Sequence, residues 1–326
     1  MMISVHSTHS RWNSSLKPIA FVKDGDILEL KVKEASDGQI RKDSDISDVT
    51  KLDFSRIHPL TGPIYVEGAH PSDTLKVEIL DIKGEGWGWT AVLSGFGFLS
   101  GEKDVPEGVN GYALKIWDSM DGYSETKFGD LRVRVKEFPF PGVIGTGLPY
   151  NGIWSTIPPR ENGGNMDVKH MTIGSTIYFP VFREGALLSI GDTHLAQGDG
   201  EVCGSAIEAP TTVKIRLSII KDKRLALPAF VSKVKQLEYE GSYITFLGFS
   251  SDLWRASVDA VKQGISFLSN FMDQVEAYML LSAVMDLKVS QVVDVPNWTV
   301  SAFLPLDVFD EKDRNELLST FERGSW

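Results

Sequence analysis

The sequence predicts a mainly β protein: a sandwich-like or jelly-roll-like core with additional barrel-like elements, followed by a C-terminal α+β part. Two observations support this fold class. Through the first two-thirds of the chain, short runs of alternating apolar and polar residues are separated by turns that contain glycine or proline, as in half-buried antiparallel strands. From about residue 250, apolar residues recur every three or four positions instead, as they do along helices.

The predicted strands follow one another closely. Strands at 19–22 and 26–33 are separated by Asp24-Gly25, and the turn residues 71–73 precede a third strand at 74–82. Further strands are predicted at residues 132–136, 175–182, 186–194 and 212–220. Residues 119–129 are interpreted as an exposed loop. The glycine- and tryptophan-rich stretch 85–98 is interpreted as a loop packed on the sandwich, with a pocket wall or an oligomer contact as the alternative.

The C-terminal part begins with a predicted helix over residues 253–268, for which Ser251 is a suitable N-cap. A second helix at about 273–287, strands at 288–293 and 299–303, and a polar helix after Phe309 complete the chain. We therefore expect residues 1–225 to form the β core that carries the site. Residues 226–326 are expected to form an α+β part packed on that core.

Composition excludes several function classes. The chain has 326 residues, and its composition of 42% hydrophobic and 24% charged residues is typical of a globular protein. The net charge is −11 and no lysine- or arginine-rich block occurs, so no nucleic-acid partner is expected. The N-terminal residues resemble no signal peptide and no apolar run reaches about 18 residues, so a cytoplasmic protein without a membrane partner is expected. The single cysteine, Cys203, is interpreted as a packed thiol within a strand.

The most informative segment is GDTHLAQGDGE, residues 191–201. Asp192 and His194 are two positions apart, and side chains two apart on a strand lie on the same face. Asp199 and Glu201 repeat this spacing beyond a glycine-containing turn. If residues 201–208 return as a strand, one imidazole and several carboxylates converge at the mouth of a hairpin. Such a cluster is either a metal site or an acid/base cluster.

Simpler interpretations compete with these roles. Asp199 can be a fourth metal ligand, a hydrogen-bond partner of His194, or only the turn residue. Glu208 is a candidate general acid or base, although it lies an odd number of residues from Glu201 and would face the other way on a regular strand. His170 is expected to be exposed.

A second polar segment is NGGNMD, residues 162–167. Gly163 and Gly164 would let the backbone approach a small ligand, while Asn165 and Asp167 project polar groups. The competing interpretation is an ordinary β-turn closed by Asn and Asp side chains.

Together these segments resemble the acetamidase/formamidase family of amide hydrolases. The matching pieces follow one another in the family's order and cover nearly the whole chain: residues 61–69, 142–145, 155–160, 162–167, 174–181 and 191–201.

The resemblance implies a small amide substrate, hydrolysis of its C–N bond to a carboxylate and ammonia, and a homo-oligomer. It favours catalytic roles for Asn165 and Asp167 and substrate binding by Asn162, Gly163 and Gly164. It also adds Asp37 as a substrate-binding candidate, because the family has a similar Asp near Gly-Gln. The N-terminal His6 and His9 are left without a role.

The metal is an inference from ligand chemistry rather than from the resemblance. The sequence contains no Gly-x-Ser-x-Gly nucleophile motif, whereas Asp192, His194 and Glu201, with Asp199, offer ligands for a divalent cation. Zinc is the first choice, with calcium or manganese as alternatives. Two other functions stay open at this point: a metal-dependent hydrolase or lyase of another small carbonyl compound, and a non-catalytic β-sandwich binding module stabilised by calcium.

Overall fold

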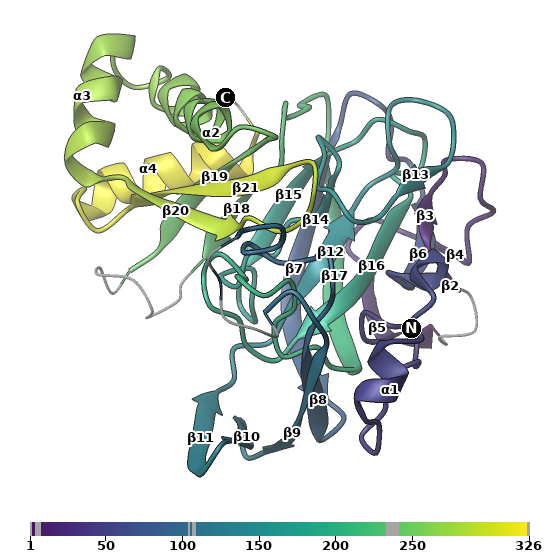
Figure 1. Ribbon diagram of the computed structural model, residues 1–326. Coiled ribbons are helices and arrows are strands. Elements are labelled where there is room, and N and C mark those ends of the chain that lie inside the picture. The colour runs from purple at the N-terminus through teal and green to yellow at the C-terminus, as the bar shows by residue number, and fades with distance from the viewer. Residues whose placement is uncertain (1, 4–7, 104, 106–108, 233–240, 325–326) are drawn as a thin grey trace.

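The structure, a computed structural model, describes residues 2–3, 8–103, 105, 109–232 and 241–324. Strands are its main secondary structure, and the longer helices gather in the C-terminal part (Figure 1). The prediction of a mainly β protein with a C-terminal α+β part is therefore confirmed. Within the described ranges, no helix has the length and apolar character needed to cross a membrane. His6 lies outside the described residues.

The largest sheet has nine strands and extends from the N-terminal to the C-terminal part of the chain. In spatial order it contains β1 (Met2–Ile3), β5 (Ile27–Val32), β17 (Thr211–Ile220), β7 (Thr74–Gly84), β15 (Thr176–Pro180), β18 (Ala229–Ser232), β19 (Tyr243–Ser250), β21 (Trp298–Pro305) and β20 (Asp286–Gln291). All neighbours pair antiparallel except β1 and β5. Both predicted parts of the chain contribute to this one sheet, and the division at residue 225 stays a prediction.

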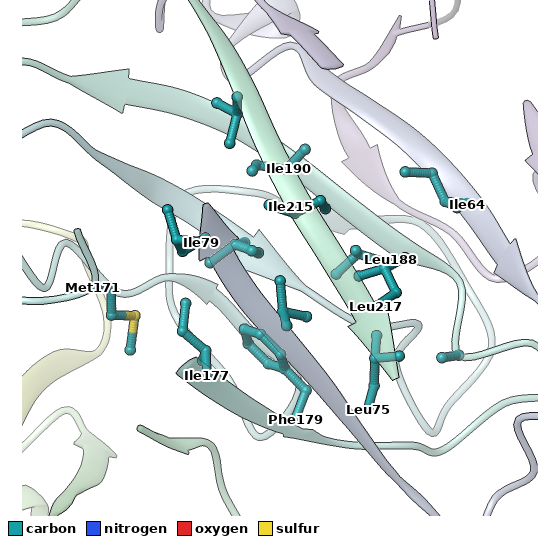
Figure 2. Close-up of a cluster of buried hydrophobic side chains, with 14 of the residues drawn as sticks. Ile64, Leu75, Ile79, Met171, Ile177, Phe179, Leu188, Ile190, Ile215 and Leu217 are labelled. Carbon is teal, nitrogen blue, oxygen red and sulfur yellow. The ribbon is translucent and has the colours of Figure 1, made fainter. Parts of the chain in front are cut away.

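A second sheet packs against the first and completes the sandwich. Its order is β14 (Gly163–Asn165), β12 (Phe140–Gly145), β16 (Leu188–His194), β6 (Leu60–Val66) and β2 (Thr8–His9), with β4 (Ala20–Val22) parallel to β6. Apolar side chains from both sheets form the main core. Figure 2 shows Leu188 and Ile190 of the second sheet in the same buried cluster as Ile177 and Ile215 of the first, all of them fully buried.

A four-stranded antiparallel sheet projects from the sandwich (Figure 1): β8 (Trp87–Val92), β9 (Ala113–Met120), β10 (Tyr123–Phe128) and β11 (Leu131–Lys136). The predicted loop at 119–129 is wrong, because these residues form β10 and its turn from β9. A single side chain of β10 is buried, which weakens the hydrophobic alternation that marks a strand, whereas β11 agrees with the strand predicted at 132–136. The predicted loop at 85–98 is also wrong in its first half, which is β8.

The C-terminal helices are α2 (Leu253–Leu268), α3 (Gln274–Val284) and α4 (Glu311–Glu322), and they share a second core with β18, β19 and β21. The N-cap of α2 is Asp252 rather than the predicted Ser251, because the Asp252 carboxylate accepts a hydrogen bond from the Arg255 N–H at 2.9 Å. A side chain at Gly248 of β19 would collide with the backbone of Ala256, so this glycine lets α2 lie close on the strand.

The remaining elements are short and lie near the N-terminal part of the sandwich. The strand β3 (Arg11–Trp12) pairs with β13 (Trp154–Ser155), and the helix α1 (Ile46–Val49) and the 3-10 helix η1 (Phe54–Arg56) connect β5 to β6.

Candidate active site

Several of the predicted site residues line a small cavity of about 60 Å³ beside the end of β16. Five carboxylates line it from different segments: Asp192 on β16, Asp167 after β14, Glu201 and Glu208 in the loop after β16, and Asp294 after β20. The side chains of Trp89, Leu93, Phe96, Ile57 and Ile157 form much of the remaining wall. Most of the acidic groups are therefore enclosed by apolar side chains rather than by water.

Local backbone geometry brings these carboxylates together. Asp167, Asp192 and Glu201 all have left-handed backbones, with φ of 48°, 52° and 49°. Each such conformation costs on the order of 1 kcal/mol for a residue with a side chain. Opposite them, Gly142 of β12 has no side chain, and a Cβ atom there would collide with the Asp167 carboxylate and lie 2.9 Å from the Asp192 Oδ2 atom. The strained backbone at Asp167 and Asp192 and the missing side chain at Gly142 therefore allow these two carboxylates to approach each other.

The predicted return strand at 201–208 is not formed, and this changes the assignment of Glu208. The segment makes turns, with a hydrogen bond of 2.8 Å from the Gly204 N–H to the Glu201 carbonyl. Glu208 exchanges two backbone hydrogen bonds with Trp89 of β8, at 2.8 and 2.9 Å. Because the path between Glu201 and Glu208 is irregular, both side chains reach the cavity despite their odd spacing.

His194 lies at the centre of the cluster. Its Nε2 atom is 3.1 Å from Glu208 Oε2 and 3.4 Å from Asp192 Oδ1, while its Nδ1 atom is 3.8 Å from Asp167 Oδ1. Two groups of metal-type ligands therefore share this imidazole: Asp192 with Glu208, and Asp167 with Glu201. Within each group the ligand atoms lie within 4.8 Å of one another.

Several of these buried atoms make no hydrogen bond among the described residues beyond their close contacts with one another. They are the His194 Nε2, Glu208 Oε2, Asp192 Oδ1, Asp167 Oδ1, Asn165 Oδ1 and Asp294 Oδ2 atoms. Leaving a buried polar atom unpaired costs about 1–3 kcal/mol, so a concentration of such atoms at one point needs a physical explanation. A ligand or ion that these oxygens and this nitrogen share would provide it.

The pKa shifts of the clustered residues also indicate that the site favours a positive charge. Burial alone would lower the pKa of His194, but the charges of Glu208 and Asp192 outweigh it and raise that pKa well above 6.5. Burial would raise the pKa of Asp192, but His58 and His194 outweigh it and hold that pKa well below its ordinary value. A proton or a cation at the His194 Nε2 atom satisfies both neighbouring carboxylates.

The other carboxylates favour their protonated forms. Burial, reinforced by the charge of Asp192, raises the pKa of Glu208 to about 8. Burial and the charge of Asp167 raise the pKa of Glu201 well above 4.5, and burial likewise raises the pKa values of Asp167 and Asp294. The cavity thus contains carboxylic acids that can carry protons near neutral pH.

Two predicted residues lie apart from this cluster. The carboxylate of Asp199, predicted as a metal ligand, forms an ion pair with Lys169 at 3.0 Å and is about one-third exposed. Its position at the tip of the turn directs it away from His194, whose Nδ1 atom contacts Gln197 at 3.0 Å instead. Asp37, predicted to bind substrate, forms ion pairs with Lys33 and Arg56 at 2.5 and 2.7 Å and does not line the cavity.

Residues 162–167 also divide into a part that lines the cavity and a part that does not. Asn165 and Asp167 line the cavity, whereas Asn162, Gly163 and Gly164 do not. The Asn162 side chain donates a hydrogen bond of 2.7 Å to the Thr146 carbonyl, and both glycines pair with β12. These three residues therefore stabilise β14, which positions Asn165, and they do not face the cavity.

Cys203, His9 and His170 do not line the cavity. Cys203 is half-buried in a turn, not in a strand, and its thiol lies 3.4 Å from the Ser205 carbonyl. His9 contacts Ser189 at 2.9 Å, away from the cavity. His170 is buried against the Phe303 ring, with a centroid distance of 4.7 Å, so its expected exposure is wrong.

Sequence reasoning missed two residues that line the cavity and gave a third group only as an alternative. His58 Nε2 lies 3.9 Å from Asp192 Oδ2, and Asp294 arrives from the C-terminal part of the chain. Trp89 and Phe96 come from the aromatic stretch for which a pocket wall is the alternative interpretation. That aromatic stretch was a usable signal. For His58 and Asp294 no local pattern distinguishes the residue from an ordinary loop side chain.

Comparison with known proteins finds relatives along nearly the whole chain. A model of the acetamidase/formamidase family matches residues 2–153 and 151–311. A protein named formamidase from Methylophilus methylotrophus is 30% identical, over 93% of this chain and 89% of that protein. A protein named acetamidase from Mycolicibacterium smegmatis is 34% identical, over 75% of this chain and 74% of that protein. The crystal structure of an acetamidase from Bacillus halodurans matches with a TM-score of 0.84 and 32% identity, covering 95% of this chain and 98% of that one.

Proposed function

The chain belongs to the acetamidase/formamidase family of amide-hydrolysing enzymes, and from this premise we propose that it hydrolyses short aliphatic amides with the help of a divalent metal ion. The products are a short carboxylate and ammonia. The observation that carries the metal assignment is the close approach of the buried His194, Glu208 and Asp192 ligand atoms beside a small cavity that Glu208 and Asp192 line.

These three residues suit a single cation. Two ligand atoms that share one zinc ion at about 2.0–2.2 Å lie roughly 3.0–3.5 Å apart. The distances of 3.1 and 3.4 Å from His194 Nε2 to Glu208 and Asp192 agree with that spacing. One imidazole and two carboxylates suit zinc first and manganese second, whereas calcium prefers oxygen ligands alone. Glu208 thus takes the ligand position that the sequence pattern assigns to Glu201.

When bound, such a cation lowers the pKa of a coordinated water to about 7 and polarises the substrate carbonyl. The chain's own residues supply the proton transfer. Burial raises the pKa of Glu201, so its carboxyl can carry a proton and donate it to the departing nitrogen while the C–N bond breaks. Asp167, which lies beside Glu201 and has a raised pKa of its own, can pass to Glu201 the proton that the attacking water gives up, so that each turnover restores the donor.

The acceptor-rich cavity explains a preference for amides. Asn165 Oδ1 is buried without a hydrogen-bond partner among the described residues and lines the same cavity. An amide NH₂ group donates two hydrogen bonds, which an ester of the same shape cannot. A site whose buried acceptors need such donors discriminates strongly against a ligand that lacks them.

The volume of the cavity limits the substrate. About 60 Å³ corresponds to the liquid volume of roughly two water molecules, which suits a ligand of only a few non-hydrogen atoms. Trp89, Leu93 and Phe96 close the wall, so a formyl or acetyl group fits and a long acyl chain does not.

The test combines a substrate panel with removal of metal. Purified protein is expected to release ammonia from formamide, acetamide and propionamide, to lose activity after exhaustive chelation, and to regain it when zinc or manganese is added. Elemental analysis before and after chelation links activity to metal content. Full activity in metal-free protein would overturn the metal assignment, and no ammonia from any short amide would overturn the reaction.

Substitution of Phe96 by alanine is expected to widen the substrate range. Phe96 is partly exposed and stacks on Phe54 with a centroid distance of 5.0 Å, so truncation opens the wall without emptying the main core. Each methylene accommodated in a pocket is worth about 1 kcal/mol or more, so the ratio of kcat/KM for butyramide over acetamide is expected to rise about tenfold or more.

Phe98→Ala is the matched control, because Phe98 belongs to the same turn, is exposed, and does not line this cavity. An unchanged butyramide/acetamide ratio in Phe96→Ala would show that this wall does not limit the acyl chain.

A further inference from the structure

Gln197 forms a hydrogen-bonded bridge between His194 and two other segments of the chain. Its Oε1 atom lies 3.0 Å from His194 Nδ1. Its Nε2 atom donates to the Asp167 carbonyl at 2.8 Å and to the Ser290 carbonyl at 3.2 Å. The amide therefore connects the imidazole to the segment after β14 and to β20.

These contacts fix the orientation of the amide. A primary amide has two N–H donors on its nitrogen and only acceptor sites on its oxygen, whereas backbone carbonyls accept only. Both carbonyls require the nitrogen end of Gln197, so the oxygen end must face His194. An acceptor at that position requires a proton on His194 Nδ1.

The proton on Nδ1 determines what the opposite nitrogen can do. Where a cation takes the place of the proton on Nε2, the imidazole is neutral, and a proton on Nδ1 then leaves the lone pair on Nε2. Nε2 is the atom that faces Glu208 and Asp192, at 3.1 and 3.4 Å. We infer that Gln197 is a positioning residue that holds His194 as the Nδ1–H tautomer and thereby directs its Nε2 lone pair to a divalent cation between Asp192 and Glu208.

This inference rests on the proposed metal-dependent function and makes it more specific. Two ligand groups share His194, but Nδ1, the ring atom nearer to Asp167, is used by Gln197. The imidazole can therefore serve only the Asp192–Glu208 group as a ligand. Asp167, Glu201 and Asp294 are left to hold protons, in agreement with Glu201 as the proton donor to the departing nitrogen.

The first measurement is zinc affinity. Gln197→Met has nearly the same length but neither donates nor accepts these hydrogen bonds. Loss of the residue that orients a metal-binding histidine weakens metal affinity by about 10–100-fold. We expect this loss in a competition titration of the full chain with zinc and a chromogenic chelator.

Gln39→Met is the matched control. Gln39 is also half-buried, and its Nε2 atom donates to the carbonyls of Ser36 and Asp53 at 2.8 and 3.2 Å, while its Oε1 atom accepts from the Asp53 N–H at 2.8 Å. It has the same three-bond pattern without a histidine. Gln39→Met is expected to lose thermal stability to a similar degree and to keep wild-type zinc affinity. Equal zinc affinity in wild type, Gln197→Met and Gln39→Met would overturn the inference.

A second experiment detects the proton on His194 Nδ1 directly. In protein labelled with ¹⁵N-histidine, wild type is expected to show a slowly exchanging proton on His194 Nδ1, and Gln197→Met is expected to lose it. The signal is assigned by its absence from His194→Asn. A wild-type ring without a proton on Nδ1 would overturn the role of Gln197 even if zinc binds. If wild type binds no divalent ion but shows this proton and its loss, the metal proposal fails while the positioning by Gln197 stands.

Discussion

Replacing Glu208 by glutamine is expected to lower kcat/KM for acetamide on the order of 10³-fold or more and to lower the bound metal content. Glutamine has the shape of glutamate but no negative charge, and a neutral amide is a poor substitute for an ionised ligand. Glu208 Oε2 lies 3.1 Å from His194 Nε2, so the substitution removes one of three ligands. Without the ion, the pKa of the attacking water rises far above neutral pH, so little of it is ionised. Steady-state ammonia release and elemental analysis measure both effects.

The control for this prediction is Asp199→Asn. The sequence predicts Asp199, in the motif at 191–201, as a metal ligand, but its carboxylate pairs with Lys169 at 3.0 Å and is about one-third exposed. Pairs of that kind contribute at most about 1 kcal/mol to stability. Asp199→Asn is therefore expected to stay within about twofold of wild type in kcat/KM. Wild-type activity in Glu208→Gln, or equal losses in both variants, would contradict a metal held by Asp192, His194 and Glu208.

The second large effect is expected from Gly142→Ala. Gly142 has no left-handed backbone, so alanine is acceptable to the main chain, but its Cβ atom would collide with the Asp167 carboxylate and contact Asp192 Oδ2 at 2.9 Å. Both carboxylates must move. A displacement of about 1 Å in such a site can cost about 10²-fold in rate, and overpacking costs about 1–3 kcal/mol in stability. We expect kcat/KM to fall at least that far in protein that still folds.

Gly198→Ala is the matched control, because Gly198 also has no left-handed backbone and a Cβ atom there meets no atom within 4 Å. It is expected to keep wild-type kinetics and melting temperature. Circular dichroism and thermal unfolding separate loss of fold from displacement of the carboxylates. A Gly142→Ala protein with full activity would show that the two carboxylates tolerate displacement and are not held in a working geometry.

The strands of the sandwich could be predicted from sequence because burial on one face imposes a period of two. The predictions at 26–33, 74–82 and 186–194 agree within one or two residues with β5, β7 and β16. The strand β10 could not be predicted in this way, because its side chains are mostly exposed and its pattern carries little hydrophobic alternation. The enzyme class, which rested on family motifs rather than on periodicity, is confirmed by the comparisons.

The site could be predicted only where motif and strand coincide. Asp192 and His194 sit at the end of a predicted strand, so their convergence was accessible from spacing alone. Glu208 could be assigned only as an acid or base, because its approach to His194 depends on backbone pairing with Trp89, more than a hundred residues earlier in the chain. Asp294 and His58 come from loops whose positions are set by long-range strand pairing, which no local pattern reveals.

Asp294 and the Ser290 carbonyl that anchors Gln197 come from the last quarter of the chain, while the imidazole they serve lies well before residue 225. A chimera that joins residues 1–225 of this protein to the C-terminal part of a relative would therefore inherit an incomplete acid cluster and an amide missing one anchor. Exchange of that part between homologues should preserve hydrolysis only when the donor supplies an equivalent carboxylate and an equivalent strand carbonyl. Under the proposed function, the C-terminal part contributes to the catalytic site and cannot be exchanged as an independent unit.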